Sequence, residues 1–474
     1  MFGNEKNWLE HLDNAIPKAA YGYKTCAYTV ALEGWRRGLE LKFINTFNTS
    51  MNAPIKFSLS DGKKQYTFAT SRGELVTKEA IKVCIDKDKT KEILSKANVA
   101  VPEGRAFNNN NSDEEIINYT KSIGFPVVLK PTNAGGGTGV ITNITNIDQF
   151  VSALFHVRNE LQYKDIMVER YVLGDDYRIY VLNNEIIGAF KRMPANVIGD
   201  GDTTIKGLID KKNKIRKNSP FLFYKPIKVD EDVKRFLYKQ NLSVDYIPKK
   251  GQLVMLRDKG SFIEGGDPID VTDLLTNSIK SNAINAVKAV PGLVQCAVDM
   301  IVDEENDVGV INELNSKPQI SNHLFPSEGI ARDIPRAIID YYFPHTKGEF
   351  RNDQFYFDLK SIIENFKNGF AKSIIIPNVP SRNYITRRYV VSGTLSNSKY
   401  KSWIMKKAKS LKLNGRVRDL NNGDVVIIAA GLLKNLDEFK ETIINNSPDK
   451  VHVSGVSQKD WNKPVKIGFE ILEK

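Results

Sequence analysis

Cysteine and histidine are scarce in this chain of 474 residues. It contains three cysteines, Cys26, Cys84 and Cys296, and five histidines. The cysteines are scattered, with neither a metal-binding spacing nor the dense pattern of a disulfide framework. A zinc centre built from Cys and His, and a small disulfide-stabilised fold, are therefore excluded.

Long hydrophobic runs are also absent. No apolar run reaches the ~18 residues that a membrane span needs, and residues 1–10 are polar and lack a signal-peptide core. Repeats and low-complexity tracts do not stand out. Hydrophobic residues make up 41% of the chain and charged residues 26%, as in ordinary globular proteins. We expect a soluble cytoplasmic protein of two to four domains with no membrane partner.

The net charge is +12, from 68 basic and 56 acidic residues. Such a charge attracts anionic ligands such as ATP or acidic substrates, but a lysine-rich surface is the more common reason for it. The lysines are dispersed, and no basic patch with interleaved aromatic residues appears. We therefore expect no nucleic-acid partner.

Helices and strands alternate along the chain, which favours α/β or α+β layering. The patterns predict helices at 27–38, 77–84, 88–97, 113–124, 147–161, 274–289, 331–342, 357–366, 401–411 and 436–444. They predict strands at 56–59, 65–69, 127–130, 166–170, 177–182, 186–192, 294–302, 308–314, 389–393, 415–419, 424–430 and 451–456.

Four parts follow from this order. We expect an N-terminal region at 1–76, a main domain at 77–345, a connecting region at 346–383 and a C-terminal domain at 384–474. The last of these reads βαββα plus a strand, the split βαβ order of ferredoxin-like folds.

A lysine and a glycine-rich loop form the first chemical motif. Lys130 ends an apolar strand, and the loop that follows contains Gly135, Gly136, Gly137 and Gly139. Backbone N–H groups of such a loop, together with one ammonium group, can hold nucleotide phosphates. The loop alone is weak evidence, because a flexible hairpin has the same composition. Lys130 strengthens it, since an unpaired lysine on a buried strand is costly.

Two acids and an amide form the second motif. Asp299, Glu313 and Asn315 lie at the apolar strands 294–302 and 308–314. Glu313 and Asn315 are two residues apart, so they lie on one face of their strand. Hard oxygen ligands of this kind hold Mg²⁺, whereas an isolated acidic pair is usually a solvated surface.

The main domain resembles the ATP-grasp domain of cyanophycin synthetase and of bifunctional glutathione synthetase, and more distantly D-alanine–D-alanine ligase. The matching segments are Asp86-Lys87, Thr90-Lys91, the Lys130 strand, Glu169-Arg170-Tyr171, Pro194 to Gly201, Gly265-Gly266-Asp267, Asp299, Glu313-Leu314-Asn315 and Pro326 to Gly329. The resemblance implies an ATP-grasp fold, ATP and Mg²⁺ (or Mn²⁺) as cofactors, and a carboxylate–amine ligase that works through an acyl phosphate and releases ADP and phosphate. Amino acids or short peptides are the implied substrates, and a homodimer is common in the family.

The resemblance also assigns roles to nucleotide residues. Lys130 and Lys87 match the phosphate-binding lysines, and the glycine loop matches a flap over the phosphates. Glu169 matches the acceptor for the adenine amino group, and Asp176 matches the ribose ligand. Lys89 and Lys91 leave the register of Lys87 open, and Asp175 competes with Asp176. Asp299, Glu313 and Asn315 match the metal ligands.

The catalytic cation is less clear. D-alanine–D-alanine ligase has an arginine two residues before its first metal aspartate, but here that position is Ala297. Arg192 is our candidate for stabilising the transferred phosphoryl group, with Arg257 next, and a structural salt bridge is the alternative for either. His323 could line the substrate pocket, although a lone histidine is more often structural.

Residues 384–474 resemble acylphosphatase, but their anion loop departs from that family. The loop 393–401 has lost its interior glycines, Lys401 stands in place of an arginine, and Asp419 in place of an asparagine. A backbone nest for phosphate needs such glycines. Within these residues no second ligase domain is recognisable, so a short amide or dipeptide-like product is expected. An acylphosphatase-type hydrolase and a non-catalytic nucleotide-binding scaffold are the alternative functions.

Overall fold

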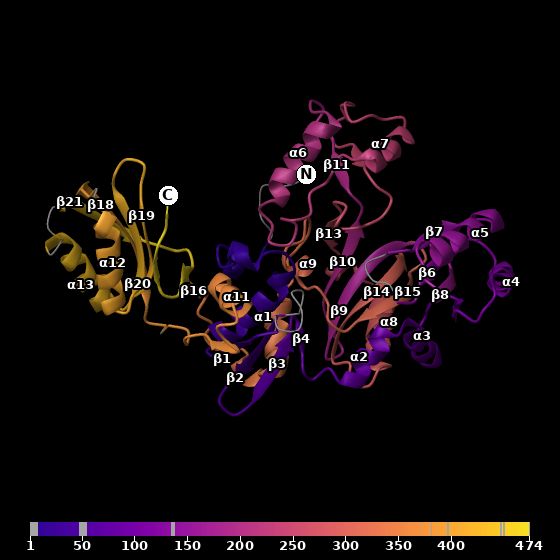
Figure 1. Ribbon diagram of the computed structural model, residues 1–474, viewed down its shortest axis with the longest axis horizontal. Coiled ribbons are helices and arrows are strands. Elements are labelled where there is room, and N and C mark those ends of the chain that lie inside the picture. Colours follow the sequence, from indigo (N-terminus) through magenta and orange to yellow (C-terminus); the bar gives the residue numbers. More distant parts are fainter. Residues whose placement is uncertain are drawn as a thin grey trace. The chain divides into compact units, whose positions relative to one another are not determined.

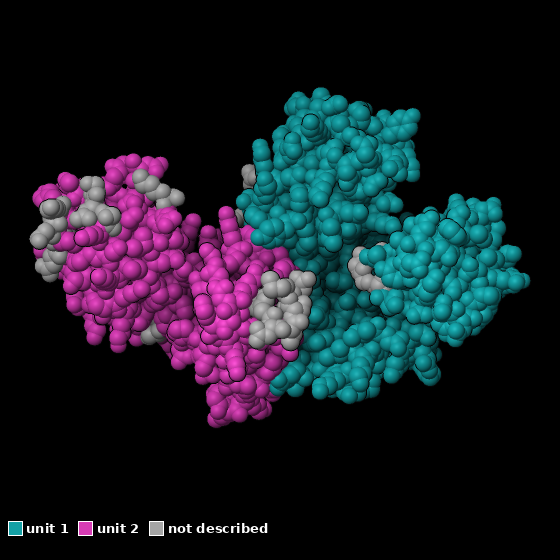
Figure 2. Space-filling model, in the orientation of Figure 1, with its two compact units in different colours: residues 1–7, 71–337 teal, residues 8–70, 338–474 magenta. Residues whose placement is uncertain are grey.

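The computed structural model describes residues 8–46, 55–133, 138–380, 382–395, 398–445, 448 and 451–473 (Figure 1). The chain divides into two compact units (Figure 2). Unit 1 comprises Ser71–Ala337 together with the first seven residues, and unit 2 comprises Trp8–Thr70 and Ile338–Lys474. No helix in the described ranges is both long and apolar enough to cross a membrane.

Unit 1 alternates helices and strands. In chain order its main elements are β4 (Arg72–Gly73), α2 (Lys78–Ile85), α3 (Lys87–Lys96), β5 (Gly104–Phe107), α4 (Asp113–Ile123), β6 (Val127–Pro131), β7 (Ile141–Ile144), α5 (Ile147–Phe155), β8 (Ile166–Arg170), β9 (Asp175–Leu182), β10 (Glu185–Met193), β11 (Asn196–Ile198), α6 (Ile205–Arg216), α7 (Glu231–Tyr238), β12 (Leu253–Met255), β13 (Asp267–Asp270), α8 (Asn277–Lys288), β14 (Gln295–Asp303), β15 (Val308–Asn315) and α9 (Ser321–Leu324). Helix α10 (Ile334–Tyr342) continues across the boundary between the units.

Local signals in the sequence account for where several of these helices begin and end. Thr77 caps α2 by accepting a hydrogen bond from the Ala80 N–H, and Asp86 caps α3 in the same way. Helix α4 ends at Gly124, whose φ of +77° is left-handed and suits glycine. The observed first residues of α2, α3 and α4 confirm the predicted helix starts near residues 77, 88 and 113.

The central sheet of unit 1 has the strand order β13-β10-β9-β14-β15. One face is apolar and packs against α2, α3 and α8, with Ile179, Val298, Met300 and Leu314 among its buried side chains. Because side chains alternate along a strand, the other face carries the polar residues between them. Asp176, Arg192, Asp299 and Glu313 therefore share that second face.

A second sheet, β5-β8-β6-β7, packs against α4 and α5. Strands β6 and β8 are antiparallel, and Lys130 lies opposite Met167 in their register. A third cluster of buried residues joins β11, β12, α6 and α7. The sequence patterns did not predict those four elements.

Unit 2 combines the chain before residue 71 with the chain after residue 337. Its elements include α1 (Thr25–Arg36), β1 (Glu40–Ile44), β2 (Lys56–Ser60), β3 (Gln65–Ala69), β16 (Phe355–Tyr356), α11 (Leu359–Lys367), β17 (Ser373–Ile375), β18 (Ile385–Thr394), α12 (Ser398–Ser410), β19 (Asn414–Asp419), β20 (Val425–Gly431), α13 (Leu433–Asn445), β21 (His452–Asp460), β22 (Val465–Lys466) and β23 (Phe469–Ile471). Strand β17 pairs with β1, so the two chain segments share one sheet.

The C-terminal part of unit 2 is a five-stranded sheet of order β21-β18-β20-β19-β23. Helices α12 and α13 cover one of its faces around a buried cluster that includes Tyr389, Ile427 and Phe439. This βαββα arrangement with a closing strand confirms the predicted ferredoxin-like fold.

Candidate functional site

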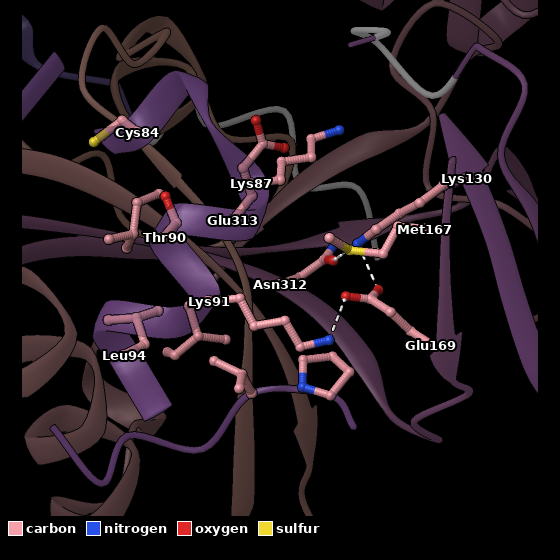
Figure 3. Close-up of a pocket in the computed structure, with 14 residues that line it drawn as sticks. Cys84, Lys87, Thr90, Lys91, Leu94, Lys130, Met167, Glu169, Asn312 and Glu313 are labelled. Atoms are coloured by element: carbon pink, nitrogen blue, oxygen red, sulfur yellow. Dashed lines mark hydrogen bonds and ion pairs between the residues drawn. The ribbon is translucent and has the colours of Figure 1, made fainter. Parts of the chain in front are cut away.

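A pocket in unit 1 brings together α3, β6, β8 and β15 (Figure 3). The charged and amide side chains that line it are Lys87, Lys91, Lys130, Glu169, Asn312 and Glu313. Four of these six were predicted from the sequence as nucleotide or metal residues. The fold therefore gathers side chains from segments more than 200 residues apart.

Glu169 lies between two ammonium groups in this pocket. Its Oε2 lies 2.5 Å from Lys130 Nζ, and its Oε1 lies 3.1 Å from Lys91 Nζ (Figure 3). Lys130 Nζ also donates to Asn312 Oδ1 at 3.3 Å. Lys130 and Glu169 are both buried, and a buried carboxylate needs such partners.

The sequence analysis left the register of the second lysine open. Lys87 and Lys91 lie four residues apart on α3, hence on one helix face, and both line the pocket. Lys91 forms an ion pair with Glu169. Burial lowers the pKa of Lys91, and the carboxylate of Glu169 opposes that shift. The helical spacing from Lys87 is the signal that could have identified Lys91.

The three predicted metal residues lie together on β14 and β15. Asp299 is the direct cross-strand partner of Glu313, and Ala297 is that of Asn315. The Asn315 amide donates to Asp299 Oδ2 at 3.2 Å. Among the described residues, the Glu313 carboxylate has no ion-pair partner, and it also lines the pocket shown in Figure 3. We call Asp299, Glu313 and Asn315 the acid set. Glu313 therefore belongs both to the acid set and to the pocket.

Two arginines hold Asp299. Arg178 donates through Nε and Nη2 to the two carboxylate oxygens, each at 2.6 Å, a bidentate contact that a lysine cannot make. Arg192 Nη2 lies 3.0 Å from Asp299 Oδ2, and its Nη1 lies 2.7 Å from Asp176 Oδ2. The predicted residues Arg192 and Asp176 therefore contact each other and the acid set.

The pKa values of Asp299 and Asp176 shift in opposite directions. Burial would raise the pKa of Asp299, but the guanidinium groups of Arg178 and Arg192 outweigh it and lower that pKa to about 2. Burial raises the pKa of Asp176, against the attraction of Arg192. Asp299 is therefore a carboxylate at all working pH values.

Arg178 was not predicted. It lies opposite Asp299 in the β9–β14 register, a pairing that one sequence does not reveal. Its signal is the spacing from Asp176, because residues two apart on a strand share a face. Arg178 places a positive charge beside Asp299, whereas the uncharged Ala297, two residues before Asp299, supplies none.

The remaining predicted residues lie elsewhere or outside the described ranges. Arg257 is buried and its Nη2 lies 2.5 Å from Asp230 Oδ2, and no described contact joins it to Asp299. Gly135, Gly136 and Gly137 fall outside the described residues. Gly139 has a φ of +69°, and a Cβ there would lie 2.9 Å from the Cγ of Pro131.

His323 is buried next to β9 and β10, the strands that carry Arg178 and Arg192. Its ring centroid is 4.8 Å from that of Phe190 and 6.1 Å from that of Tyr180. Neither ring nitrogen has a hydrogen-bond partner in the described part of the chain. Burial lowers the pKa of His323 to about 3, so the imidazole is neutral at working pH.

Asp299, Glu313 and Asn315 offer two carboxylates and an amide oxygen, the ligand types that Mg²⁺ takes in proteins. No group of three or more His, Cys, Asp or Glu side chains suited to a metal is found among the described residues. A cation at this place would be bound by Asp299, Glu313 and the amide oxygen of Asn315. Oxygens of a bound phosphate and of water would complete its coordination shell. Mg²⁺ commonly binds through one or two carboxylates together with substrate phosphates and water.

Comparisons with known proteins relate two parts of the chain to known families. Residues 86–182 match the family model "Carbamoyl-phosphate synthase L chain, ATP binding domain", and residues 387–471 match "Acylphosphatase". The glutathione biosynthesis bifunctional protein GshAB of Clostridium perfringens is 32% identical over 327 residues, which cover 66% of this chain and 40% of that protein. Cyanophycin synthetase of Synechocystis sp. is 31% identical over 297 residues, covering 61% and 33%.

A solved structure shows the same relationship. The crystal structure of a bifunctional glutathione synthetase from Pasteurella multocida has a TM-score of 0.50 and 28% identity, covering 64% of this chain and 42% of that one. The chain thus spans less than half the length of these relatives. It contains an ATP-grasp domain of their kind and a C-terminal acylphosphatase-like domain, which confirms the resemblance seen in the sequence.

Proposed function

We propose that this chain is an ATP-dependent ligase that joins a carboxylate to an amine and releases ADP and phosphate. One observation carries the proposal: the lysine-lined pocket and the acid set share Glu313. A nucleotide in that pocket would have its phosphates next to oxygen ligands for a divalent cation. Amino acids or short peptides are the proposed substrates, and a short amide is the product.

Binding of ATP uses the pocket residues. Lys130, with Lys87 or Lys91, supplies ammonium groups for the phosphates, since phosphate oxygens accept charge-assisted hydrogen bonds. The carboxylate of Glu169 can accept a hydrogen bond from the adenine amino group. Asp176 is the proposed ribose contact, although it is bonded to Arg192 here.

The proposed chemistry passes through an acyl phosphate. A substrate carboxylate oxygen attacks the γ-phosphorus and ADP leaves; the amine nitrogen then attacks the acyl carbon and phosphate leaves. When bound, Mg²⁺ neutralises charge on the phosphates. Arg192 and Arg178 hold Asp299 ionised and add positive charge where phosphoryl oxygens become more negative. Positioning and charge stabilisation are the main contributions of the chain.

Release of ADP with pooled amino acids tests the function. The full chain should release ADP only when a suitable carboxylate and amine are both present, and Lys130→Ala should abolish this while the variant remains folded. Lys121→Ala on the exposed face of α4 is the matched control. ADP release that ignores added substrates, or equal rates in Lys130→Ala, would contradict the proposal. Hydrolysis of acyl phosphates instead would favour the acylphosphatase-type alternative, and no turnover with intact ATP binding would favour the scaffold.

The metal assignment has its own prediction. Glu313→Gln should lower ATP turnover by at least ~100-fold, because the cation supplies several kcal/mol of charge stabilisation and each 1.4 kcal/mol is tenfold. Mg²⁺ or Mn²⁺ should be required, whereas Zn²⁺ should not substitute. Glu305→Gln, on the exposed hairpin between β14 and β15, is the control. Full activity in excess EDTA would remove the metal from the account.

A further inference from the structure

A second pocket lies on the C-terminal sheet of unit 2, away from the helices α12 and α13. Its lining is Arg388 from β18, Arg416 and Arg418 from β19, Val426 and Ile428 from β20, and Trp461. The buried cluster under the helices uses the alternate residues of the same strands, such as Tyr389 and Val417. The arginines therefore project from the face that the helices leave uncovered. We call this the arginine pocket.

Strand pairing fixes the geometry of the arginine pocket. Ile428 lies opposite Arg388 on one side and opposite Arg416 on the other. Neighbouring strands are ~4.8 Å apart, so the backbones of these two arginines flank an apolar floor only two strand spacings wide. Arg418 lies two residues beyond Arg416 and faces Val426. Three guanidinium groups can thus converge over one small area.

The charge of the arginine pocket is uncompensated. In the described part of the chain, no carboxylate forms an ion pair with Arg388, Arg416 or Arg418. By contrast Arg387, on the opposite face of β18, pairs with Asp460. The nearest acid in the strand register is Glu470, opposite Arg416 on β23, and its carboxylate pairs with Lys466. Three unpaired cations in one pocket attract an anion.

Trp461 adds a second requirement for a ligand. Its indole Nε1 is buried and has no hydrogen-bond acceptor among the described residues. Because an indole N–H can only donate, this group needs an acceptor. Guanidinium groups also only donate. The arginine pocket therefore offers donors, positive charge, an aromatic ring and an apolar floor, and its ligand must supply acceptor oxygens and a flat apolar part.

We propose that the arginine pocket binds a nucleoside di- or triphosphate at a site separate from the ATP-grasp pocket. A phosphate chain presents several charged oxygens and can accept hydrogen bonds from all three guanidinium groups. One carboxylate can bind only one guanidinium group in a bidentate manner. A base can stack on an aromatic ring such as that of Trp461. This proposal does not depend on the ligase activity, because all its residues lie in unit 2.

Calorimetric titration of ADP into the full chain tests the proposal. Wild-type protein should show two classes of ADP site per chain. Arg388→Ala/Arg416→Ala should lose one class and keep the other, and Lys130→Ala should show the reverse pattern. The control Lys407→Ala/Lys409→Ala removes two charges from the exposed side of α12 and should keep both. A melting temperature close to that of wild type shows that each variant is folded.

Further variants identify the ligand class. Arg416→Lys keeps the positive charge but loses the bidentate contact of a guanidinium group. It should raise the Kd for ADP at the unit 2 site by ~10-fold or more. Trp461→Leu should make ADP bind no better than inorganic tripolyphosphate, while wild type prefers ADP and ignores adenosine. A single ADP site that survives Arg388→Ala/Arg416→Ala would overturn the proposal. So would an arginine-dependent site that binds a hexaglutamate peptide but not ADP.

Discussion

At the scale of single residues, Glu169 is held by two ion pairs in the pocket of unit 1. It is buried and its two oxygens contact two different lysines, Lys91 and Lys130. Removing one partner from such a pair leaves charge that the remaining contact does not fully balance. If Glu169 accepts the adenine amino group as proposed, the ion pair with Lys91 fixes the orientation of its carboxylate for that contact.

Lys91→Met tests this arrangement. It should raise the Kd for ATP by ~10-fold or more, because a hydrogen bond to a charged group contributes about 1.5–3 kcal/mol and 1.4 kcal/mol is tenfold. Lys89→Met on the exposed side of α3 should leave the Kd unchanged. Equal effects of the two variants, measured by equilibrium dialysis, would show that only net charge matters.

His323 predicts a dependence of stability on pH. Burial lowers its pKa from the ordinary 6.5 to about 3, so between these values the unfolded chain binds one more proton than the folded chain. Stability is then fully present above pH 6.5 and falls as the pH falls below it. The slope reaches ~1.4 kcal/mol per pH unit.

The measurement compares urea unfolding of wild type and His323→Phe at pH 7.5 and 5.5. Wild type should lose ~1.4 kcal/mol more than the variant over this interval. His452→Gln, at an exposed position of β21, should behave as wild type. If His323→Phe shows the same loss as wild type, the imidazole is not the group that titrates.

At the scale of elements, the anion loop of the C-terminal domain is the clearest departure from a known pattern. Gly393 remains, with a φ of +142° at a bulge where a Cβ would meet the backbone of His452. Lys401 at the start of α12 forms an ion pair with Asp419 at the end of β19. The cation that could attract a phosphate is thus matched by a carboxylate. Ser396 and Asn397 lie outside the described residues.

The C-terminal domain should therefore not hydrolyse acyl phosphates. Benzoyl phosphate incubated with the full chain, without ATP, should decay at the rate seen in buffer alone. The reason is that Asp419 both repels the anion and cannot donate a hydrogen bond as an asparagine amide could. Hydrolysis above that rate, lost in Lys401→Ala, would show that the loop retains activity.

Elements with strong local signals were predictable from the sequence. Strand β8 was predicted at its observed bounds, and helices α2 to α4 begin within about one residue of the predicted positions, because caps and periodicity are local properties. The elements from β11 to β12 were missed, since a small lobe with short strands gives little periodic signal. The resemblance predicted site roles for Lys130, Glu169, Asp299 and Glu313, and the fold brings these residues close together. Arg178 depends on a long-range strand pairing that no local pattern encodes.

At the scale of the whole molecule, segments distant in sequence combine within each unit. In unit 2 the strand β17 joins β1 across more than 300 residues, and in unit 1 the pocket joins α3 to β15. Each unit carries its own cluster of positive side chains, which is consistent with a net charge of +12. Anion binding in this protein is therefore expected at defined pockets rather than over a general basic surface.

The central claim is that ATP phosphorylates a substrate carboxylate in the ATP-grasp pocket. Transfer of ¹⁸O tests it most directly, with a substrate found in the amino acid screen and labelled in its carboxylate. If an acyl phosphate forms, one labelled oxygen per turnover moves from the carboxylate to the released phosphate, because that oxygen bonds to the γ-phosphorus before the amine displaces it. Mass spectrometry of the phosphate should show this label. Amide product formed with unlabelled phosphate would contradict the account.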